Sequence, residues 1–290
     1  ALCAAACVLV PTISSAATLT VDCAGTGFTT IQDALDAAAS GDTILIEPCV
    51  YEEQVSVAGK TVTLIGSGAE TTELLWTGAG TAFYIDMPNT GIFSIEGLRI
   101  TRVPETGTAL HWSEYGIVLR DCVITGWSGG GINYGCAEVE DCTISRLGVS
   151  GCVRQTIVSD SRIGSMGIGG VQFVGGNSLA SERSRYGELV LGCLAYASCL
   201  EDSIGRVEVP GGLDCWSAFH AQDSTIDTLL GTRGPEVMLD RCITGDITCT
   251  YVWEEDLVPL SIRECVVEGD ITVEPGWKTR TKPSARKPQT

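Results

Sequence analysis

A six-residue motif returns along most of this chain and limits the folds that the chain can adopt. Its clearest copies are Arg120-Asp-Cys-Val-Ile-Thr125 and Glu140-Asp-Cys-Thr-Ile-Ser145. Aligned on their small third residue, the copies fall at Cys122, Cys142, Ser161, Ser203, Ser224, Cys242 and Cys265, with a blurred copy near Ser184 and a degenerate one at residues 96–101. A repeat of roughly 20 residues predicts a solenoid, in which each unit buries its apolar face only against its neighbours.

Each repeat consists of short extended pieces in which apolar and polar residues alternate, as in Ala137-Glu-Val-Glu-Asp141. No stretch of helical spacing is long enough to give one helix per repeat. The Leu and Asn signature of leucine-rich repeats is also missing. We therefore predict an all-β fold, a parallel β-helix with three short strands per turn. Glycine pairs such as Gly129-Gly130 and Gly169-Gly170 are expected at corners that need positive φ.

The small residue of the motif is expected to point inward and to stack on its equivalents along the solenoid axis, where Cys behaves as a small hydrophobe. The acid before it, such as Asp121, Asp202 or Asp223, is expected at the corner itself. There a carboxylate can accept hydrogen bonds from the backbone N–H groups of the turn. The alternative is a column of acids about 4.8 Å apart that holds cations such as Ca²⁺ between turns.

The two ends of the chain differ from the repeats. Residues 1–17 are apolar and end in small residues, which is typical of a secretory signal peptide that has lost its beginning; a buried first strand is the alternative. Residues 18–275 form the predicted solenoid, with an amphipathic capping helix at about 29–40 that Thr29 or Thr30 begins and Gly41 ends. Residues 276–290 are rich in Pro and in basic residues, and we expect them to be disordered.

The charge of the chain excludes some partners. The formal net charge is −18, and a group of the bases (Lys278, Arg280, Lys282, Arg286 and Lys287) lies after Gly276, so the body is more acidic still. Nucleic acid is a poor partner because phosphate binding needs a basic face. An acidic polysaccharide would need bridging Ca²⁺, which is the one cofactor that we consider. No later apolar run approaches the length of a membrane span. We expect the protein to be an exported monomer that is either secreted or located at the cell surface.

The N-terminal part carries a family resemblance. Phe28-Thr-Thr-Ile-Gln-Asp-Ala-Leu-Asp-Ala-Ala38, Gly41-Asp-Thr-Ile-Leu-Ile-Glu-Pro48 and Val50-Tyr-Glu-Glu53 resemble the opening of the pectin lyase-like superfamily, which pectin methylesterases share. With the repeats, the resemblance covers residues 20–275 and implies a right-handed parallel β-helix. It is specific for the fold and says little about activity, because the superfamily includes lyases, hydrolases, esterases and non-catalytic surface proteins.

The cysteines divide into three groups. Cys49 stands where the resembled family has a glycine, and in the family layout its segment lies beside that of Cys23, so the resemblance implies a Cys23–Cys49 disulfide. The stacked cysteines of the motif are expected to be free. Loop bridges Cys193–Cys199 and Cys242–Cys249 are a further hypothesis. Metal binding by these cysteines is the weaker interpretation, because no His accompanies them.

The sequence does not assemble a catalytic site. The chain has only two histidines, and the Gln222-Asp223 pair resembles the Gln-Asp element of pectin methylesterases without the rest of that pattern. Polysaccharide lyases of the superfamily use Ca²⁺ and an Arg or Lys base, which makes Asp240 and Arg241 candidates, although an Arg beside an Asp is more often a surface ion pair. No carboxylate pair can be nominated for glycoside hydrolysis. The catalytic candidates are therefore Asp223, Asp240 and Arg241.

Aromatic and acidic side chains near the C-terminal end are better candidates for binding a ligand. Aromatic faces with carboxylates suit sugars, with or without Ca²⁺. The residues concerned are Trp216, His220, Tyr251, Trp253, Glu254, Glu255 and Asp256. A hydrophobic cap with a solvated acidic rim explains the same residues. We predict a non-catalytic surface scaffold or glycan-binding module that meets extracellular polysaccharide or a cell-surface component. A divergent polysaccharide lyase or glycoside hydrolase, and a purely structural stalk, are the alternatives.

Overall fold

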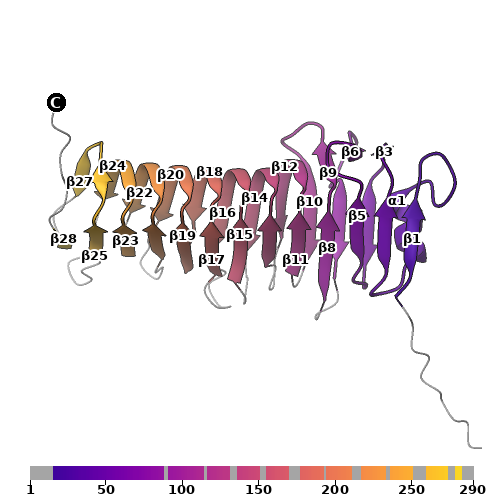
Figure 1. Ribbon diagram of the computed structural model, residues 1–290, viewed down its shortest axis with the longest axis horizontal. Helices are drawn as coiled ribbons and strands as arrows, with labels where there is room; N and C mark the ends of the chain where they lie inside the picture. Colours follow the sequence, from indigo (N-terminus) through magenta and orange to yellow (C-terminus); the bar gives the residue numbers. More distant parts are fainter. Residues whose placement is uncertain are drawn as a thin grey trace, which may run out of the picture.

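The computed structural model confirms the all-β parallel β-helix, with two long sheets that run the length of the molecule (Figure 1). It describes residues 16–87, 91–113, 116–130, 136–150, 155–169, 177–192, 194–210, 217–232, 236–250, 259–273 and 278–282. All strand pairs are parallel, and α1 (Ile31–Ala37) lies at the N-terminal end. Residues 1–15 of the expected signal peptide lie outside the described residues.

The first sheet, sheet A, has 13 strands. In their order across the sheet they are β1 (Thr18–Val21), β2 (Thr43–Ile46), β5 (Thr63–Gly66), β8 (Ile92–Glu96), β11 (Gly116–Arg120), β13 (Ala137–Glu140), β15 (Gln155–Ser159), β17 (Asn177–Glu182), β19 (Ala195–Leu200), β21 (Ala218–Gln222), β23 (Glu236–Asp240), β25 (Pro259–Arg263) and β28 (Lys278–Lys282). Neighbours in this order come from successive turns, so sheet A records the repeat of the sequence directly.

The second sheet, sheet B, has 15 strands. They are β3 (Cys49–Glu52), β4 (Val55–Ala58), β6 (Thr72–Trp76), β7 (Phe83–Asp86), β9 (Arg99–Arg102), β10 (Thr108–Ser113), β12 (Val123–Gly130), β14 (Thr143–Ser150), β16 (Arg162–Gly169), β18 (Arg185–Leu191), β20 (Ser203–Pro210), β22 (Thr225–Thr232), β24 (Ile243–Thr250), β26 (Val266–Val267) and β27 (Ile271–Val273). Its strands are longer in the middle of the molecule than at either end.

The number of strands per turn changes along the solenoid. The early turns have three short strands, as predicted, for example β8, β9 and β10. From β12 on, one bent strand replaces two, because β9 and β10 both pair with β12. The bend needs glycine in several turns: a Cβ on Gly187 would lie 2.4 Å from the carbonyl oxygen of Gly164 in the neighbouring turn. The prediction of three strands is therefore corrected for the later turns.

The sharp corner between the sheets is formed by the residue before the inward small residue. It has a left-handed backbone, with φ between 48° and 54°, at Asp121, Asp141, Asp160, Arg183, Glu201, Asp223, Arg241 and Glu264. Asp tolerates this conformation better than most residues, which explains its recurrence. The expected glycine corners are wrong where they are described, since Gly129 and Gly130 lie inside β12 and Gly169 ends β16.

The residue after each corner points inward and forms a ladder along the axis. Its members are Cys122, Cys142, Ser161, Ser184, Asp202, Ser224, Cys242 and Cys265, all at most 3% exposed. The alignment was therefore wrong in one copy: Asp202, not Ser203, is the inward residue, and Glu201 occupies the corner. Because this copy has two acids in a row, aligning it on its Asp-Ser pair placed the inward position one residue too late. The blurred copy at Ser184 is confirmed.

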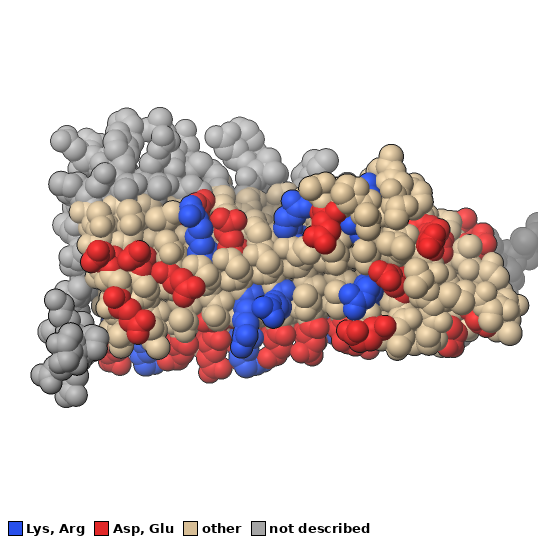
Figure 2. Space-filling view, turned by 90° about the horizontal axis from the view of Figure 1, so that it is seen from above, with Lys and Arg blue, Asp and Glu red and all other residues tan. Residues whose placement is uncertain are grey.

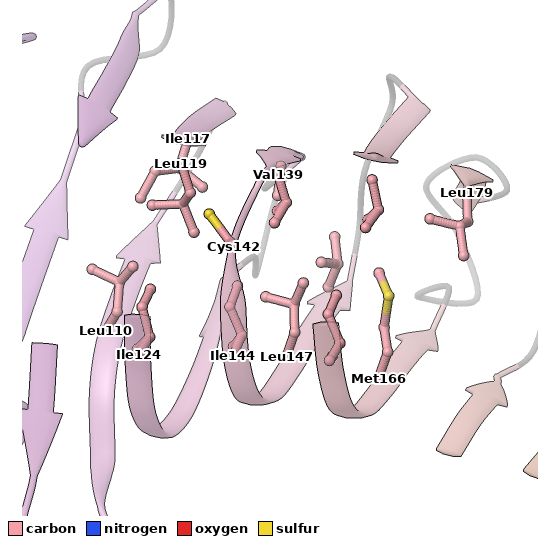
Figure 3. Close-up of a cluster of buried hydrophobic side chains, with 14 of the residues drawn as sticks. Leu110, Ile117, Leu119, Ile124, Val139, Cys142, Ile144, Leu147, Met166 and Leu179 are labelled. Atoms are coloured by element: carbon pink, nitrogen blue, oxygen red, sulfur yellow. The ribbon is translucent and has the colours of Figure 1, made fainter. Parts of the chain in front are cut away.

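Aliphatic side chains fill the space between the sheets on either side of the ladder. Figure 3 shows Cys142 projecting into the core among Leu119, Val139 and Ile144. Because every turn presents equivalent residues inward, the core is one continuous column from Val21 to Cys265. Such a core is stabilised mainly by contacts between neighbouring turns.

The N-terminal cap explains the residues that carry the family resemblance. Thr30 begins the helix by accepting a hydrogen bond from Asp33 N, and Glu53 accepts two more from Ile31 N and Gln32 N at 2.7 and 3.0 Å. Lys60 donates to the last carbonyls of the helix. The helix is shorter than the predicted 29–40, since Ala38 is already extended. Ile31, Ala34, Leu35 and, just after the helix, Ala38 are buried.

Cysteine pairing follows the prediction in part. The Cys23–Cys49 disulfide is present. Cys136 is also disulfide-bonded. The buried ladder cysteines are free, as expected. The loop bridges Cys193–Cys199 and Cys242–Cys249 are wrong, because Cys199, Cys242 and Cys249 are free and buried.

The basic C-terminal segment departs from its prediction where it is described. Residues 278–282 form β28, which pairs with β25 at the end of sheet A. The expectation of a disordered tail is therefore corrected for these residues. Residues 283–290 lie outside the described part of the chain.

Candidate functional site

The outer face of sheet A carries the predicted residue His220 in a small polar cluster. His220 points outward from β21 between Tyr196 of β19 and Glu236 of β23. The Tyr196 hydroxyl lies 3.0 Å from His220 Nδ1, and His220 Nε2 lies 3.7 Å from Glu236 Oε1. The two rings meet edge to face, at 84°. The cluster thus connects three consecutive turns of the solenoid.

Burial decides the charge of His220. It lowers the pKa of the imidazole, and the nearby Glu236 carboxylate opposes the shift without reversing it. A neutral ring fits the contacts if the Tyr196 hydroxyl donates to Nδ1 and Nε2 carries the hydrogen. Strand pairing also sets Ser198 beside His220. Both ring nitrogens are directed at Tyr196 and Glu236, so Ser198 is not placed as a nucleophile activated by this histidine.

The three catalytic candidates meet at the corner that follows β21 and β23. Arg241 donates to both carboxylate oxygens of Asp223, at 2.7 and 2.6 Å, and to Asp240 at 2.9 Å. The Arg241 guanidinium lowers the pKa of the Asp223 carboxyl, and Asp223 raises the pKa of Arg241 further above its usual value. Both groups are therefore charged at neutral pH and paired with each other. This is the geometry of a surface ion pair.

The same kind of ion pair offsets the repulsion between corner carboxylates of neighbouring turns. Arg241 pairs with Asp223, and Arg183 pairs with Asp160 at 2.7 Å, so arginines at the corner position neutralise neighbouring corner acids. Figure 2 shows basic side chains among the acidic ones along one edge of the solenoid. Among the described residues, no group of three or more His, Cys, Asp or Glu side chains could hold a metal ion. The other predicted ligand-binding residues, Trp216, Tyr251, Trp253, Glu254, Glu255 and Asp256, lie outside the described residues.

A second site, on the outer face of sheet B, was not predicted. Tyr84 of β7, His111 of β10 and Trp127 of β12 form a row across three neighbouring strands. The Tyr84 and His111 ring centroids are 5.2 Å apart with 14° between the planes, and those of His111 and Trp127 are 6.5 Å apart with 23°. Tyr84 is 40% exposed and Trp127 is 37% exposed. We call these three residues the aromatic row.

Two glycines decide where the indole of Trp127 lies. A Cβ on Gly129 would fall 2.5 Å from the indole Cη2 and Cζ2 atoms, and one on Gly148 would fall 3.4 Å from Cζ2. The indole therefore covers the backbone of Gly129, at the position where an outward side chain would stand. Gly129 is the strand partner of His111, so this placement brings the indole beside the imidazole.

The surroundings of the aromatic row are polar and carry both signs of charge, because Arg146 of β14 pairs with Trp127 at one end and Asp86 lies at the other. The Ser113 hydroxyl donates to Asp86 Oδ1 at 2.5 Å, two residue pairs beyond Tyr84 and His111 on the same face. Burial lowers the pKa of His111, and a hydrogen bond to the backbone of Gly129 opposes that shift. The row therefore presents three neutral rings at pH 7, with hydroxyl and carboxylate groups at its edge.

The repeat of the sequence does not reveal this row. Positions 84, 111 and 127 do not follow a period of roughly 20 residues, because the chain between β9 and β10 is longer than in later turns. Strand register also pairs Trp127 with Thr108 and Arg146 rather than with His111. The one available signal is glycine at 129 and 148, on neighbouring strands, which leaves room for a ring.

No family model matches the sequence, and no curated protein matches it. Among solved structures, carrot pectin methylesterase is 15% identical with a TM-score of 0.40, covering 91% of this chain and 88% of its own. PemA, the pectin methylesterase from Erwinia chrysanthemi, is 14% identical with a TM-score of 0.41 and 92% of each chain covered. The Aspergillus niger pectin methylesterase is 17% identical with a TM-score of 0.39, covering 94% and 83%. These likenesses are distant and carry no argument about the family or the activity of this chain.

Within the described part of the chain, no helix is long and apolar enough to span a bilayer.

Proposed function

We propose that this protein is a glycan-binding β-helix and that the aromatic row is its binding platform. The observation that carries the proposal is the exposed, nearly parallel arrangement of Tyr84, His111 and Trp127. The π face of an aromatic ring is electron-rich and attracts the weakly positive C–H groups on the apolar face of a sugar ring. Polar groups at the rim, such as Ser113 and Asp86, suit the equatorial hydroxyls of the same sugar.

The direction of the row indicates an extended chain. Its three rings stand on neighbouring strands of sheet B, so they follow the solenoid axis rather than one turn. Consecutive sugars of an unbranched chain could then contact consecutive rings. A pocket for a single sugar would instead enclose its ligand on several sides.

The charge of the surface favours an uncharged glycan. The chain carries a formal net charge of −18, and the Asp86 carboxylate at one end of the row is set against the Arg146 guanidinium at the other, so the row itself has no excess of positive charge. A polyanionic sugar would be repelled at this position unless a cation bridged the two. We therefore propose a neutral polysaccharide as the partner, bound without Ca²⁺.

Export of the protein belongs to the same proposal. A disulfide such as Cys23–Cys49 is stable in oxidising compartments outside the cytoplasm, where polysaccharide is also found. The apolar segment 1–17 suits a secretory signal. The protein then meets its glycan in the extracellular space or at the cell surface.

A carbohydrate-active enzyme is the second candidate, and one observation favours it. Tyr196, His220 and Glu236 join a phenol, an imidazole and a carboxylate on one face of sheet A. Proton transfer by such a chain is chemically reasonable. Against it, the edge carboxylates Asp223 and Asp240 are already paired with Arg241.

The experiment is a panel of neutral and acidic polysaccharides offered to the purified protein with Ca²⁺ or with a chelator. Binding is followed by affinity electrophoresis, and new reducing or unsaturated ends are assayed in parallel. The variants are the double change Tyr84→Ala with Trp127→Ala and, as the matched aromatic control on the other face, Tyr196→Ala.

We expect binding to a neutral polysaccharide that the chelator does not affect, that the double variant loses and that Tyr196→Ala keeps. Unchanged binding by the double variant would contradict the proposal. New ends that disappear with His220→Ala would support the enzyme instead.

A further inference from the structure

The inward ladder is built from side chains that both accept and donate a hydrogen bond. Ser161 Oγ accepts from Cys142 N at 3.0 Å and donates to the carbonyl of Ser159 at 2.8 Å. The same donation to the carbonyl two residues earlier occurs at Cys122, Cys142, Ser184, Ser224, Cys242 and Cys265. Each hydroxyl or thiol thus connects its own turn to the preceding one without any charge.

Asp202 is the one carboxylic acid in this ladder. It is 2% exposed, its Oδ1 accepts from Ser184 N at 2.7 Å, and its backbone N–H donates to Ser224 Oγ at 3.1 Å. Its other oxygen, Oδ2, is buried with no hydrogen-bond partner. An ionised carboxylate can accept but has no hydrogen to donate, so it cannot repeat what the hydroxyls and thiols do. A buried, half-satisfied charge is also costly.

The groups that face Asp202 do not supply a compensating charge. Tyr186 of β18 and Cys199 of β19 lie beside it, and the Tyr186 hydroxyl is 2.6 Å from Ser181 Oγ of β17. Burial raises the pKa of both Tyr186 and Cys199 well above their usual values, so both stay neutral near pH 7. The charged group that acts on it is Glu182, which repels a second anion. Asp202 is therefore the group of this cluster that can change charge.

We propose that Asp202 is a proton-operated rung: when protonated it joins the turns before and after it, and when ionised it loosens them. In a solenoid each turn contacts only its neighbours, so one weakened rung lowers the coupling between the two parts of the molecule that it separates. Here those parts are the turns up to β18 and the turns from β20 onward. This inference does not depend on glycan binding.

The pH range follows from the direction of the shift. Burial raises the pKa of Asp202 from 3.8 to about 6, opposed by the hydrogen bond from the Ser184 backbone and by the nearby polar Ser181 and Cys199 side chains. The folded state then holds its proton more tightly than the unfolded state. The contribution of Asp202 to stability is full below about pH 4 and is lost as the pH rises through about 6. Acids paired on the surface, such as Asp160 and Asp223, act in the opposite sense because their pKa is lowered.

The experiment compares Asp202→Ser with the wild-type protein by thermal unfolding from pH 4 to pH 8. Serine restores the residue that the neighbouring rungs use. The difference in Tm between variant and wild type isolates Asp202 from the surface acids, because those are the same in both proteins. We expect the Tm of the variant minus the Tm of the wild type to increase by roughly 5 °C between pH 4 and pH 8.

Two further variants make the result decisive. Asp202→Asn is uncharged at every pH and should also flatten the profile relative to the wild type. Glu201→Gln removes the exposed acid next to it and should leave the wild-type profile unchanged. Hydrogen exchange gives a second reading: the amide of Ser184, which Asp202 Oδ1 accepts, should exchange faster at pH 8 than at pH 5 after correction for intrinsic rates. A Tm difference between Asp202→Ser and wild type that is constant with pH, or one that Glu201→Gln reproduces, would overturn the proposal.

Discussion

The two outer faces of the solenoid carry the same pair of ring types in opposite arrangements. On sheet B, Tyr84 and His111 lie nearly parallel, at 14°, and their hydroxyl and imidazole do not bond to each other. On sheet A, Tyr196 and His220 meet at 84° and a hydrogen bond joins them. The first pair exposes its ring faces, whereas the second is joined edge to face through the Tyr196 hydroxyl and His220 Nδ1. Residue type therefore does not distinguish the two faces, but ring geometry does.

Neighbouring backbone accounts for the difference between the two faces. Beside the sheet B pair, glycines at 129 and 148 leave space that the Trp127 indole occupies, which extends the pair to three rings. Beside the sheet A pair, Glu236 occupies the next strand and turns its carboxylate toward His220. The rings on sheet B therefore form a row along the solenoid axis, whereas the side chains on sheet A contact one another in a cluster.

The largest expected effect is that of Trp127→Ala. It removes the ring at the end of the platform nearer the C-terminus, whose side chain is the largest of the three and is 37% exposed. We expect a loss of about 2 kcal/mol in glycan binding, roughly 30-fold in Kd, as for an aromatic residue that dominates an interface. Isothermal titration with a neutral oligosaccharide measures it. The comparison requires that the melting temperature of the variant stays close to that of the wild-type protein.

Gly129→Ala tests the position of the indole without removing any ring. The new Cβ would collide with Cη2 and Cζ2 of Trp127 and push the ring away from its place. We expect roughly a tenfold weaker Kd, which is about 1.4 kcal/mol. The matched control is Gly167→Ala in β16, two strands away in the same register, where a Cβ meets nothing within 4 Å. Equal losses in both variants would mean that the indole is not the cause.

The pH dependence of binding should report His111. Burial lowers its pKa below the usual 6.5, so the ring is neutral at pH 7. A glycan that covers it removes more water and favours the neutral form further. Affinity should therefore be constant from pH 7 to pH 8 and fall once the pH drops below the pKa of His111. If glycan binding lowers that pKa by about half a unit, the fall is roughly threefold. His111→Gln should give a flat profile over the same range.

The smallest effect on binding should come from Tyr196→Phe. It deletes one hydrogen bond of the sheet A cluster and leaves the aromatic row untouched. We expect unchanged glycan binding and a loss of about 1 kcal/mol in the free energy of unfolding. Denaturant titration measures the second quantity. Weaker binding in this variant would erase the distinction between the two faces.

The sequence predicted the parts of the fold that depend on local chemistry. The left-handed corner favours Asp, so Asp121, Asp141, Asp160 and Asp223 marked the turns correctly. The capping helix followed from its own apolar spacing, and the Cys23–Cys49 disulfide from the family resemblance. Each of these depends on neighbours in sequence or on a shared motif.

Features that depend on the register between turns were not predictable in the same way. At Glu201-Asp202-Ser203 the sequence allows two alignments one residue apart, and only the packed core decides that Asp202 points inward. The aromatic row needs the tilt of the Trp127 side chain over Gly129, which strand pairing alone would place beside Thr108. Of the predicted ligand-binding residues, His220 is placed on an outer face, in a cluster whose members contact one another.

The most direct test of the central claim is saturation-transfer NMR on the protein with a neutral oligosaccharide. Aromatic protein protons are irradiated, and the transfer of saturation to the sugar C–H protons is recorded. If the glycan lies on the aromatic row, the C–H protons of consecutive sugars receive saturation in the wild-type protein and in Tyr196→Ala, and lose most of it in the Tyr84→Ala, Trp127→Ala double variant. Equal transfer in that double variant would contradict the account.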